Sequence, residues 1–272
     1  MPTSIRSAVL LCSLFTFTGR LLAMPAAAEN DIAVVIACQG DVKVVPGKSN
    51  IGIPCVKGGV INPGDWMKTG PGSAVTLAFD KKFDNLVTIQ ENSLTVVLPD
   101  GYFNINLIEG AVFGNLENIK SNQVFRIMTP ATSTEASNGG WCIRNEGPYT
   151  DVSVVDGVVF VSGVNPDGTV KGEKSAVEKG FGRKTTNSGD PGELEATPGS
   201  ITAWFQEQVI KHREMKRTAR QELSDNKLQI ERQPASIVQG KMTNGTTIIA
   251  DGREVDLVDF IYQERVKNWK GR

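Results

Sequence analysis

Residues that commonly build active sites are scarce in this 272-residue chain. It has one histidine, His212, and aromatic residues make up only 7% of the sequence. No serine or cysteine nucleophile motif lies near His212, so we expect a surface histidine and not a catalytic base. The spacings G-x-S-x-G, G-x-x-x-x-G-K-[ST] and H-E-x-x-H are missing, and so is an EF-hand loop. We therefore expect neither catalysis nor a cofactor.

An excess of charge of one sign is also missing, since 29 Lys and Arg residues stand against 30 Asp and Glu residues. A nearly balanced chain is not a general nucleic-acid binder, because such proteins carry a basic surplus that neutralises phosphates. The acidic residues are scattered along the chain. An envelope hydrolase with two carboxylates is therefore only a distant alternative, which would require a cleft that gathers them.

The four cysteines form neither a C-x-x-C pair nor a cluster with histidine, which argues against a zinc site. Cys38 and Cys55 flank a segment rich in glycine and proline that can fold two strands together. A disulfide between them is one expectation in an oxidising compartment. The alternative is that Cys38, Cys55 and Cys142 are all small buried thiols.

Long apolar runs are missing except at the N-terminus. Residues 1–28 are typical of a secretory signal peptide, with Arg6 as the positive part, an apolar core over residues 8–17 and an Ala-Ala-Ala cleavage site that ends at Ala28. Arg20 interrupts the apolar stretch, which is too short for a spanning helix. We expect cleavage after Ala28 and no membrane span afterwards, so the protein would be periplasmic or secreted. The alternative is an uncleaved N-terminal anchor.

Glycine, in contrast, is plentiful, with 28 residues, and it separates many short apolar runs. Turn dipeptides such as Asp156-Gly157 divide these runs and are strong hairpin signals. Many short strands without intervening helices predict a mainly β domain of a layered or β-solenoid-like kind. Between residues 74 and 162 the strand candidates are 74–79, 86–89, 94–98, 103–107, 111–114, 124–128, 141–144, 150–155 and 158–162, and further short strands are expected at 32–37, 42–45, 54–57 and 175–177.

The central motif is a turn at residues 62–73 that leads into an alternating strand. Asp65 lies in this turn, where an aspartate more often hydrogen-bonds nearby backbone than acts as an acid or base. The motif residues are Gly64, Asp65, Thr69, Gly70 and Ser73. Further landmarks follow in order: Gly40-Asp41-Val42, Asn92-Ser93, Leu107 with Gly110, Thr129-Pro130, Val152-Ser153-Val154 and Gly157-Val158-Val159.

This ordered set, over about residues 35–185, resembles the FecR domain, the periplasmic module of bacterial iron-uptake regulators and of many stand-alone envelope proteins. The resemblance implies a β-rich binding module. In those regulators the domain follows a cytoplasmic anti-sigma region and one membrane span. Because this chain has neither, we expect a stand-alone sensor, scaffold or adaptor with an envelope protein as partner.

One segment departs from the family pattern, because residues 131–140 are polar where FecR-like sequences are apolar. We expect an exposed loop here, which would be a candidate partner surface. Its residues are Thr132, Ser133, Thr134 and Glu135.

The only convincing helix runs from Ile201 to about Asn226, with Ser200 as its N-cap. Its apolar stripe should dock on the β domain. The stripe consists of Ile201, Trp204, Phe205, Ile210, Met215, Ala219 and Leu223. The basic residues of the helix are Lys211, Arg213, Lys216, Arg217 and Arg220. They form either a solvated face or a contact for an acidic partner, an acidic polymer or, weakly, a membrane surface of anionic lipid.

The predicted organisation is a signal peptide at 1–28, a FecR-like β domain at 29–185, a linker at 186–200 and a C-terminal part at 201–272. The last part holds the helix, a β-hairpin around Asp251-Gly252 and a short terminal helix. The expected function is non-catalytic protein binding in the envelope, for which strand addition at an exposed edge is one mode. A carbohydrate- or peptidoglycan-binding module is the main alternative, and it requires an exposed Trp66 or Trp141.

Overall fold

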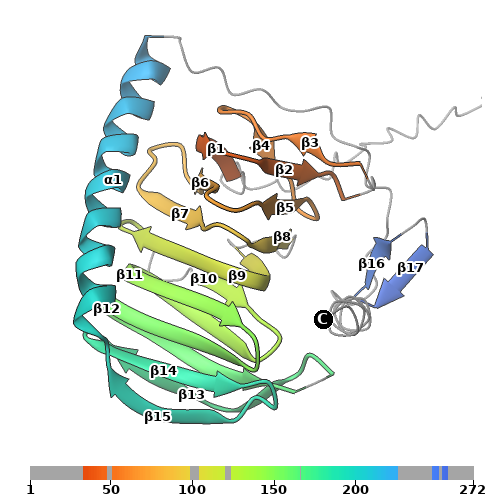
Figure 1. The fold of residues 1–272 in the computed structure, drawn as a ribbon, viewed down its shortest axis with the longest axis vertical. Coiled ribbons are helices and arrows are strands. Elements are labelled where there is room, and N and C mark those ends of the chain that lie inside the picture. The colour runs from red at the N-terminus through yellow and green to blue at the C-terminus, as the bar shows by residue number, and fades with distance from the viewer. Residues whose placement is uncertain are drawn as a thin grey trace, which may run out of the picture.

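The computed structural model describes residues 33–47, 51–98, 104–119, 124–165, 167–225, 247–250 and 253–256. This part of the chain is mainly β with one long helix, as the sequence predicts (Figure 1). The predicted signal peptide and the predicted terminal helix lie outside the described residues. No helix within the described residues is both long and apolar enough to cross a membrane.

The strands of the main sheet are β1 (Ala33–Gln39), β2 (Val42–Val45), β3 (Ile53–Pro54), β4 (Val60–Ile61), β5 (Trp66–Thr69), β6 (Ala74–Ala78), β7 (Asn85–Ile89), β8 (Leu94–Leu98), β9 (Asn104–Leu116), β10 (Phe125–Met128), β11 (Thr132–Glu146), β12 (Tyr149–Val164), β13 (Val170–Glu178), β14 (Phe181–Thr186) and β15 (Pro191–Ala196). The helix α1 (Gly199–Ser224) follows, and β16 (Thr247–Ala250) pairs with β17 (Arg253–Asp256) in the predicted C-terminal hairpin.

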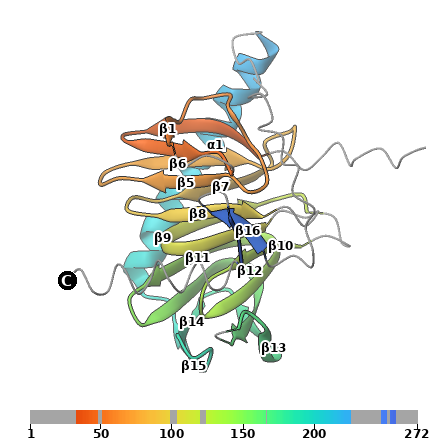
Figure 2. The same ribbon diagram turned by 90° about the vertical axis from the view of Figure 1, so that its right-hand side faces the viewer.

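The main sheet folds into two walls that share one hydrophobic core. The first wall contains β4, β1, β6 and β7, and at the other end of the molecule β14 and β15. The second wall contains β3, β2, β5 and β8, and at the other end β10 and β13. The strands stack in layers from β1 to β15 (Figure 2), which agrees with the predicted layered architecture.

Three long strands belong to both walls and change walls at a glycine. The first part of β9 pairs with β8 and β10, and its second part pairs with β7 and β11. The first part of β11 pairs with β10 and its second part with β9, and β12 pairs first with β14 and then with β13. The change falls at Gly110, Gly139 and Gly157, whose φ angles are +93°, +118° and +79°. Because these φ values disfavour residues with a Cβ, glycine marks each place where the chain turns from one wall to the other.

The core between the walls is built by side chains from both. Trp141 is fully buried, and its ring lies 5.8 Å from the ring of Phe125, which in turn packs edge-on against Phe79. Gly114 makes room for Trp141, because a Cβ at Gly114 would lie 2.1 Å from Trp141 Cζ2. Trp141 is therefore a buried anchor and cannot be a sugar-stacking platform.

The two walls differ on their outer faces, and the sequence reflects this. Along β7 every residue is buried, since the core covers one face of the first wall and α1 covers the other. In β2 and β5 of the second wall, buried residues alternate with more exposed ones. A strand covered on both faces has a continuous apolar or small-residue pattern, whereas a strand with one face in water alternates.

The predicted exposed loop at residues 131–140 is wrong, because residues 132–146 form β11. Thr132 and Thr134 are fully buried. The hydroxyl of Thr129 lies 3.0 Å from that of Thr132 and 2.8 Å from that of Thr150, so the buried hydroxyls satisfy one another. Polar composition indicated a loop, but β-branched threonine also suits a strand.

The predicted linker at residues 186–200 contains the strand β15, which pairs with β14 and forms one edge of the sheet. Pro191 and Gly192 stand at its first two positions. Proline is tolerated there because an edge strand leaves some N–H groups without a partner strand. This segment is therefore part of the sheet, and the boundary between domain and C-terminal part stays a prediction.

Candidate functional site

The motif residues that carry the FecR resemblance hold together the turns at one corner of the walls. The Thr69 hydroxyl donates a hydrogen bond to the Gln90 carbonyl (2.5 Å) and accepts one from the Ser93 amide (2.9 Å). The Gly70 amide donates to the Asp41 carbonyl at 2.9 Å. We call this set of hydrogen bonds the turn clamp.

Two serines extend the turn clamp to the neighbouring turns. Ser73 Oγ accepts the Asp41 amide at 2.9 Å, and Ser93 Oγ accepts the Ala111 amide at 3.0 Å. Gly110 lies so close that a Cβ would be 2.1 Å from Ser93 Oγ. The spacing of the motif thus follows from how successive turns pack on one another.

Asp65 also binds backbone, as predicted. Its carboxylate accepts hydrogen bonds from the amide of Gly47 (3.1 Å) and from the amide (2.8 Å) and side chain (3.2 Å) of Asn62. Burial raises the pKa of Asp65, and these three hydrogen bonds oppose that effect. Because its acceptor positions are used for the turn, Asp65 is a structural residue.

The helix α1 lies along the outer face of the first wall and spans the stack (Figure 1). Its inward positions are seven residues apart, at Phe205, His212 and Ala219, all buried. Two residues of the predicted apolar stripe face water instead, with Ile210 55% and Leu223 38% exposed. The face of α1 that packs on the sheet therefore contains a histidine, which a pattern of apolar residues could not predict.

The expectation that His212 is a surface residue is wrong. His212 Nε2 lies 2.7 Å from the hydroxyl of Thr88 on β7, and its ring packs 4.7 Å from that of Phe113. Burial lowers the pKa of His212 to about 3, so the imidazole is neutral at ordinary pH. It is a packing residue of the helix–sheet interface.

The start of α1 also differs from the prediction. The helix begins at Gly199 with Pro198 in the N-cap position, and no side chain caps it. Ser200, the predicted cap, is instead the second helical residue. Proline fixes a φ close to −65°, which suits an extended residue just before a helix as well as its first turn.

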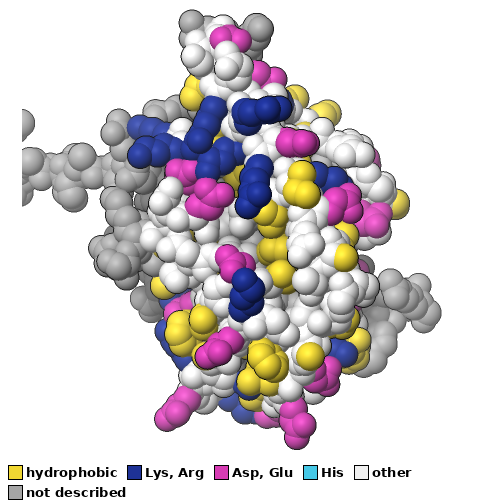
Figure 3. Space-filling view, turned by 90° about the vertical axis from the view of Figure 1, so that its left-hand side faces the viewer, with side chains coloured by type: hydrophobic (Ala, Val, Ile, Leu, Met, Phe, Trp, Pro, Cys, Tyr) yellow, Lys and Arg dark blue, Asp and Glu magenta, His cyan; other side chains and the backbone are white. Residues whose placement is uncertain are grey.

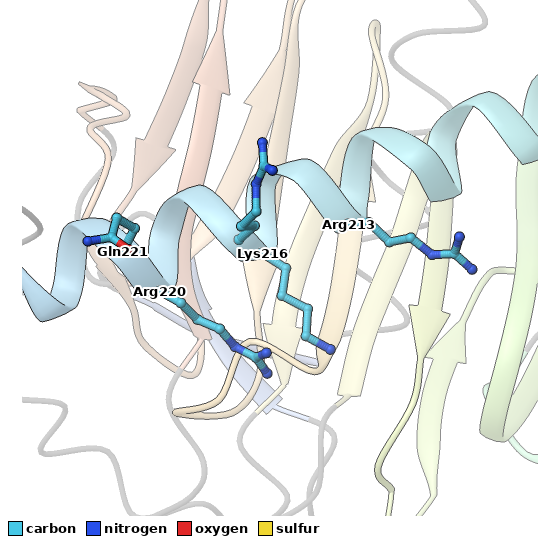
Figure 4. A pocket seen from close by; sticks show the side chains of 5 residues that line it. Arg213, Lys216, Arg220 and Gln221 are labelled. Atoms are coloured by element: carbon cyan, nitrogen blue, oxygen red, sulfur yellow. The ribbon is translucent and has the colours of Figure 1, made fainter.

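Basic side chains gather over the upper part of the face on which α1 lies (Figure 3). There an open groove of about 350 Å³ runs along one flank of the helix. We call it the basic groove; it is lined by Arg213, Lys216, Arg217, Arg220 and Gln221. Lys216, Arg220 and Arg213 extend to the same side of the helix (Figure 4).

Two cations of the basic groove are held by acidic residues of the sheet. Lys216 Nζ forms ion pairs with Asp84 and Glu117. Arg220 donates from Nη2 to Asp84 Oδ1 at 2.8 Å and from Nε to the Lys82 carbonyl at 2.7 Å. Composition gave no signal for Asp84 or Glu117 as partners, since each is far from the helix in sequence.

Asp84 is the centre of this cluster, and its side chain is only 8% exposed. Burial would raise the pKa of Asp84, but hydrogen bonds from Lys216 and Asn118 and the charges of Lys216 and Arg220 outweigh it, so the pKa is lowered. Burial also opposes the charge on Lys216, yet its two acidic partners raise the pKa of this lysine overall. Both groups are therefore charged at neutral pH.

The other basic residues of α1 are disposed differently. Lys211 pairs with Glu207 at 2.7 Å, one turn earlier on the helix. Arg213 and Arg217 are exposed, and neither has an acidic partner among the described residues. Four of the five predicted basic residues therefore line the basic groove. Lys216 and Arg220 bind acidic residues of the sheet, whereas Arg213 and Arg217 are exposed to solvent.

The predicted loop residues do not join this surface. Ser133 is buried like its neighbours Thr132 and Thr134, and Glu135 binds Arg126 (3.0 Å) and Lys174 (2.6 Å). These contacts lie in β10, β11 and β13. The candidate surface from residues 132–135 is therefore not supported by their positions.

The predicted disulfide is not formed in this structure. Cys38, Cys55 and Cys142 are all free thiols. Cys38 Sγ donates a hydrogen bond to the Cys55 carbonyl at 3.6 Å. The two residues are therefore neighbours, as the segment rich in glycine and proline between them predicts. Among the described residues, no group of three or more His, Cys, Asp or Glu side chains could hold a metal ion.

The fold and the turn clamp together define a β scaffold whose motif residues are used for turns. The family model described as "FecR protein" matches residues 65–160. The resemblance is thereby confirmed, and this stretch is a FecR domain.

Two solved structures resemble the fold at 14% sequence identity, and both are described as a "putative anti-sigma factor" from Parabacteroides distasonis ATCC 8503. The first has a TM-score of 0.40 and covers 52% of this chain, which spans 64% of that protein's length. The second has a TM-score of 0.31, with 76% and 89% coverage. No curated protein matches the chain. Likeness of this extent defines neither a partner nor an activity.

Proposed function

We propose that this protein is an exported, non-catalytic FecR-domain protein that acts in the bacterial envelope as a sensor, scaffold or adaptor by binding a protein partner. The observation that carries the proposal is the use of the motif residues. Thr69, Ser73 and Asp65 direct their polar groups to backbone atoms of neighbouring turns. The domain is thus a rigid support, and the family landmarks build its shape.

Two surfaces of this support suit a protein partner. The outer face of α1 is long, exposed and held by the sheet beneath it. The edge strand β15 has all six residues exposed, and an extended segment of a partner could pair with its free backbone groups. Glu193 and Glu195 on this edge would favour a basic strand over a second copy of β15.

Site-specific photo-crosslinking of the tagged full-length protein in its own cells tests the proposal. A photoreactive residue would replace Gln206 on α1, Leu194 on β15, or Lys68 on the outer face of the second wall as a control. Capture of one defined envelope protein from Gln206 or Leu194, but not from Lys68, supports the proposal. Capture of the chain alone from all three positions, or its recovery in the cytoplasmic fraction, contradicts it.

Glycan binding is the second candidate, and Trp66 is the residue that favours it. Trp66 is half-buried, whereas Trp141 is fully buried and its ring cannot stack on a sugar. Retention of the protein on insoluble peptidoglycan, lost in a Trp66→Ala variant that still folds, would favour this candidate. Unchanged retention, or none at all, would leave the protein-binding proposal in place.

A further inference from the structure

The basic groove contains an arginine that is fixed in place before any ligand arrives. Arg220 uses Nε and one N–H of Nη2 to bind Lys82 and Asp84. Its side chain is nevertheless 48% exposed, so the remaining N–H donors of the guanidinium are open to water. A cation immobilised by the protein loses little conformational entropy when it binds an anion.

Arg217 and Arg213 line the same groove as Arg220. They precede Arg220 by three and seven residues, which places them one and two helical turns away. At a rise of 1.5 Å per residue the three guanidinium groups emerge over about 10 Å of helix. Three arginines spaced along a helix match several carboxylates spaced along a peptide better than they match one compact anion.

The surroundings of these arginines favour a protein segment over a bilayer. The site is a groove, so it receives a chain segment more readily than a flat surface. Glu214 is exposed outside the groove, where a bilayer would meet it but a segment lying in the groove would not. Ile210 is 55% exposed and precedes Arg213 by one turn, which offers an apolar contact at the end of this set of arginines.

We propose that the basic groove binds an acidic segment of a protein partner, whose carboxylates pair with Arg213, Arg217 and Arg220 while Ile210 packs against an apolar residue of that segment. This inference rests on the proposed function and names the chemistry of its partner. Asp84 and Lys216 take no part in the contact. They hold Arg220 and the helix in position.

A binding titration tests the inference with a defined probe. The probe is a fluorescent helix-forming peptide with glutamates at positions i, i+4 and i+7, and the matched control peptide has glutamines there. Anisotropy would be measured with the full-length protein at low and at physiological salt. We expect binding of the glutamate peptide that weakens with salt, and at least tenfold weaker binding of the glutamine peptide.

Two double variants separate the groove from overall charge. Arg213→Gln with Arg217→Gln should weaken binding about tenfold, a change that corresponds to loss of two moderately exposed ion pairs. Lys43→Gln with Lys68→Gln removes the same charge from cross-strand neighbours on the second wall and should change binding less than about twofold. Circular dichroism would verify that both variants fold.

Three outcomes would overturn the inference: equal weakening in both double variants, no binding of the glutamate peptide by the wild type, or binding only to phosphatidylglycerol vesicles. The proposed function can be judged separately. A partner captured from Gln206 equally well in the Arg213→Gln, Arg217→Gln background would leave the proposed function standing and refute the role of the basic groove.

Discussion

The ring of Phe205 rests on the backbone of Gly140, so closely that a Cβ on Gly140 would lie 2.1 Å from Phe205 Cζ. Phe205 belongs to the first turns of α1, and Gly140 belongs to β11 where that strand has just entered the first wall. The Phe113 ring, 4.7 Å away, packs edge-on against Phe205 from β9. Helix and sheet are therefore joined at this point by shape as well as by apolar burial.

The first prediction concerns this contact. Gly140→Ala should destabilise the protein by about 1–3 kcal/mol, because an added methyl group forces Phe205 or the strand to move. Gly199→Ala is the matched control, since nothing lies within 4 Å of a Cβ there. It should change stability by less than about 0.5 kcal/mol. Urea unfolding followed by near-ultraviolet circular dichroism measures both, and equal stability of the two variants would refute the packing argument.

The second prediction is a loss of stability with acid that originates at His212. Its pKa falls from an ordinary 6.5 to about 3 on folding, so the unfolded chain takes up a proton that the folded chain refuses. The contribution is complete above pH 6.5 and is lost as the pH falls from 6.5 towards 3. Below pH 6 the slope should approach about 1.4 kcal/mol per pH unit.

Denaturant unfolding at a series of pH values from 7 to 4 measures this slope. His212→Gln keeps a polar group for Thr88 but does not titrate, so its curve should be flatter than that of the wild type. The lowered pKa values of Asp84 and Glu135 also cost stability towards pH 4, but equally in both proteins, so the difference between the two curves reports His212. Parallel curves for the two proteins would contradict the assignment to His212.

The third prediction addresses the acid beneath the basic groove. Asp84→Asn removes the charge that holds both Lys216 and Arg220, and Lys216 is left only 16% exposed with Glu117 alone. Loss of a mostly buried partner of this kind should cost about 3 kcal/mol. Asp156→Asn is the control, because its ion pair with Lys179 is exposed and should be worth less than about 1 kcal/mol. Similar thermal unfolding midpoints for both variants would show that the cluster is not structural.

The fourth prediction concerns the turn clamp. Thr69→Val keeps the shape of the side chain but removes the hydroxyl that serves Gln90 and Ser93, and this should cost about 2 kcal/mol. Thr69→Ser retains the hydroxyl and should recover most of that loss. Hydrogen exchange at the Ser93 amide gives a local readout, and it should speed up in Thr69→Val only. Unchanged protection there would mean that the hydroxyl is dispensable.

The strands were predictable because their signals are local. Alternation from Ala74 to Phe79 and turn dipeptides such as Asp156-Gly157 specify strand and bend without knowledge of the rest of the fold. The FecR landmarks were recognisable for a related reason, since each turn of the clamp needs a small or hydroxyl-bearing residue at a fixed place. Asp65 binds the backbone of its own turn, so its role could also be expected from neighbouring residues.

The failures arise where the partner is distant in sequence. His212 is buried because Thr88 and Phe113 meet it, and these residues lie on two separate strands of the first wall. Thr132 and Thr134 are polar, but Thr129 and Thr150 satisfy their hydroxyl network inside the sheet. A sequence displays polarity and not the partner that compensates for it, so these residues were assigned to the surface.

The path of α1 has a consequence for how the protein is made. The helix is the last described part of the domain before its C-terminal hairpin, yet it returns along the whole stack to cover the first strand. Ala219 packs with Ile36 of β1, and Glu222 pairs with Lys57 nearby. A chain that emerges N-terminus first during synthesis therefore exposes an apolar outer face on β1 until nearly the entire domain has emerged. The fold is then completed only when α1 is available to cover the first described strand.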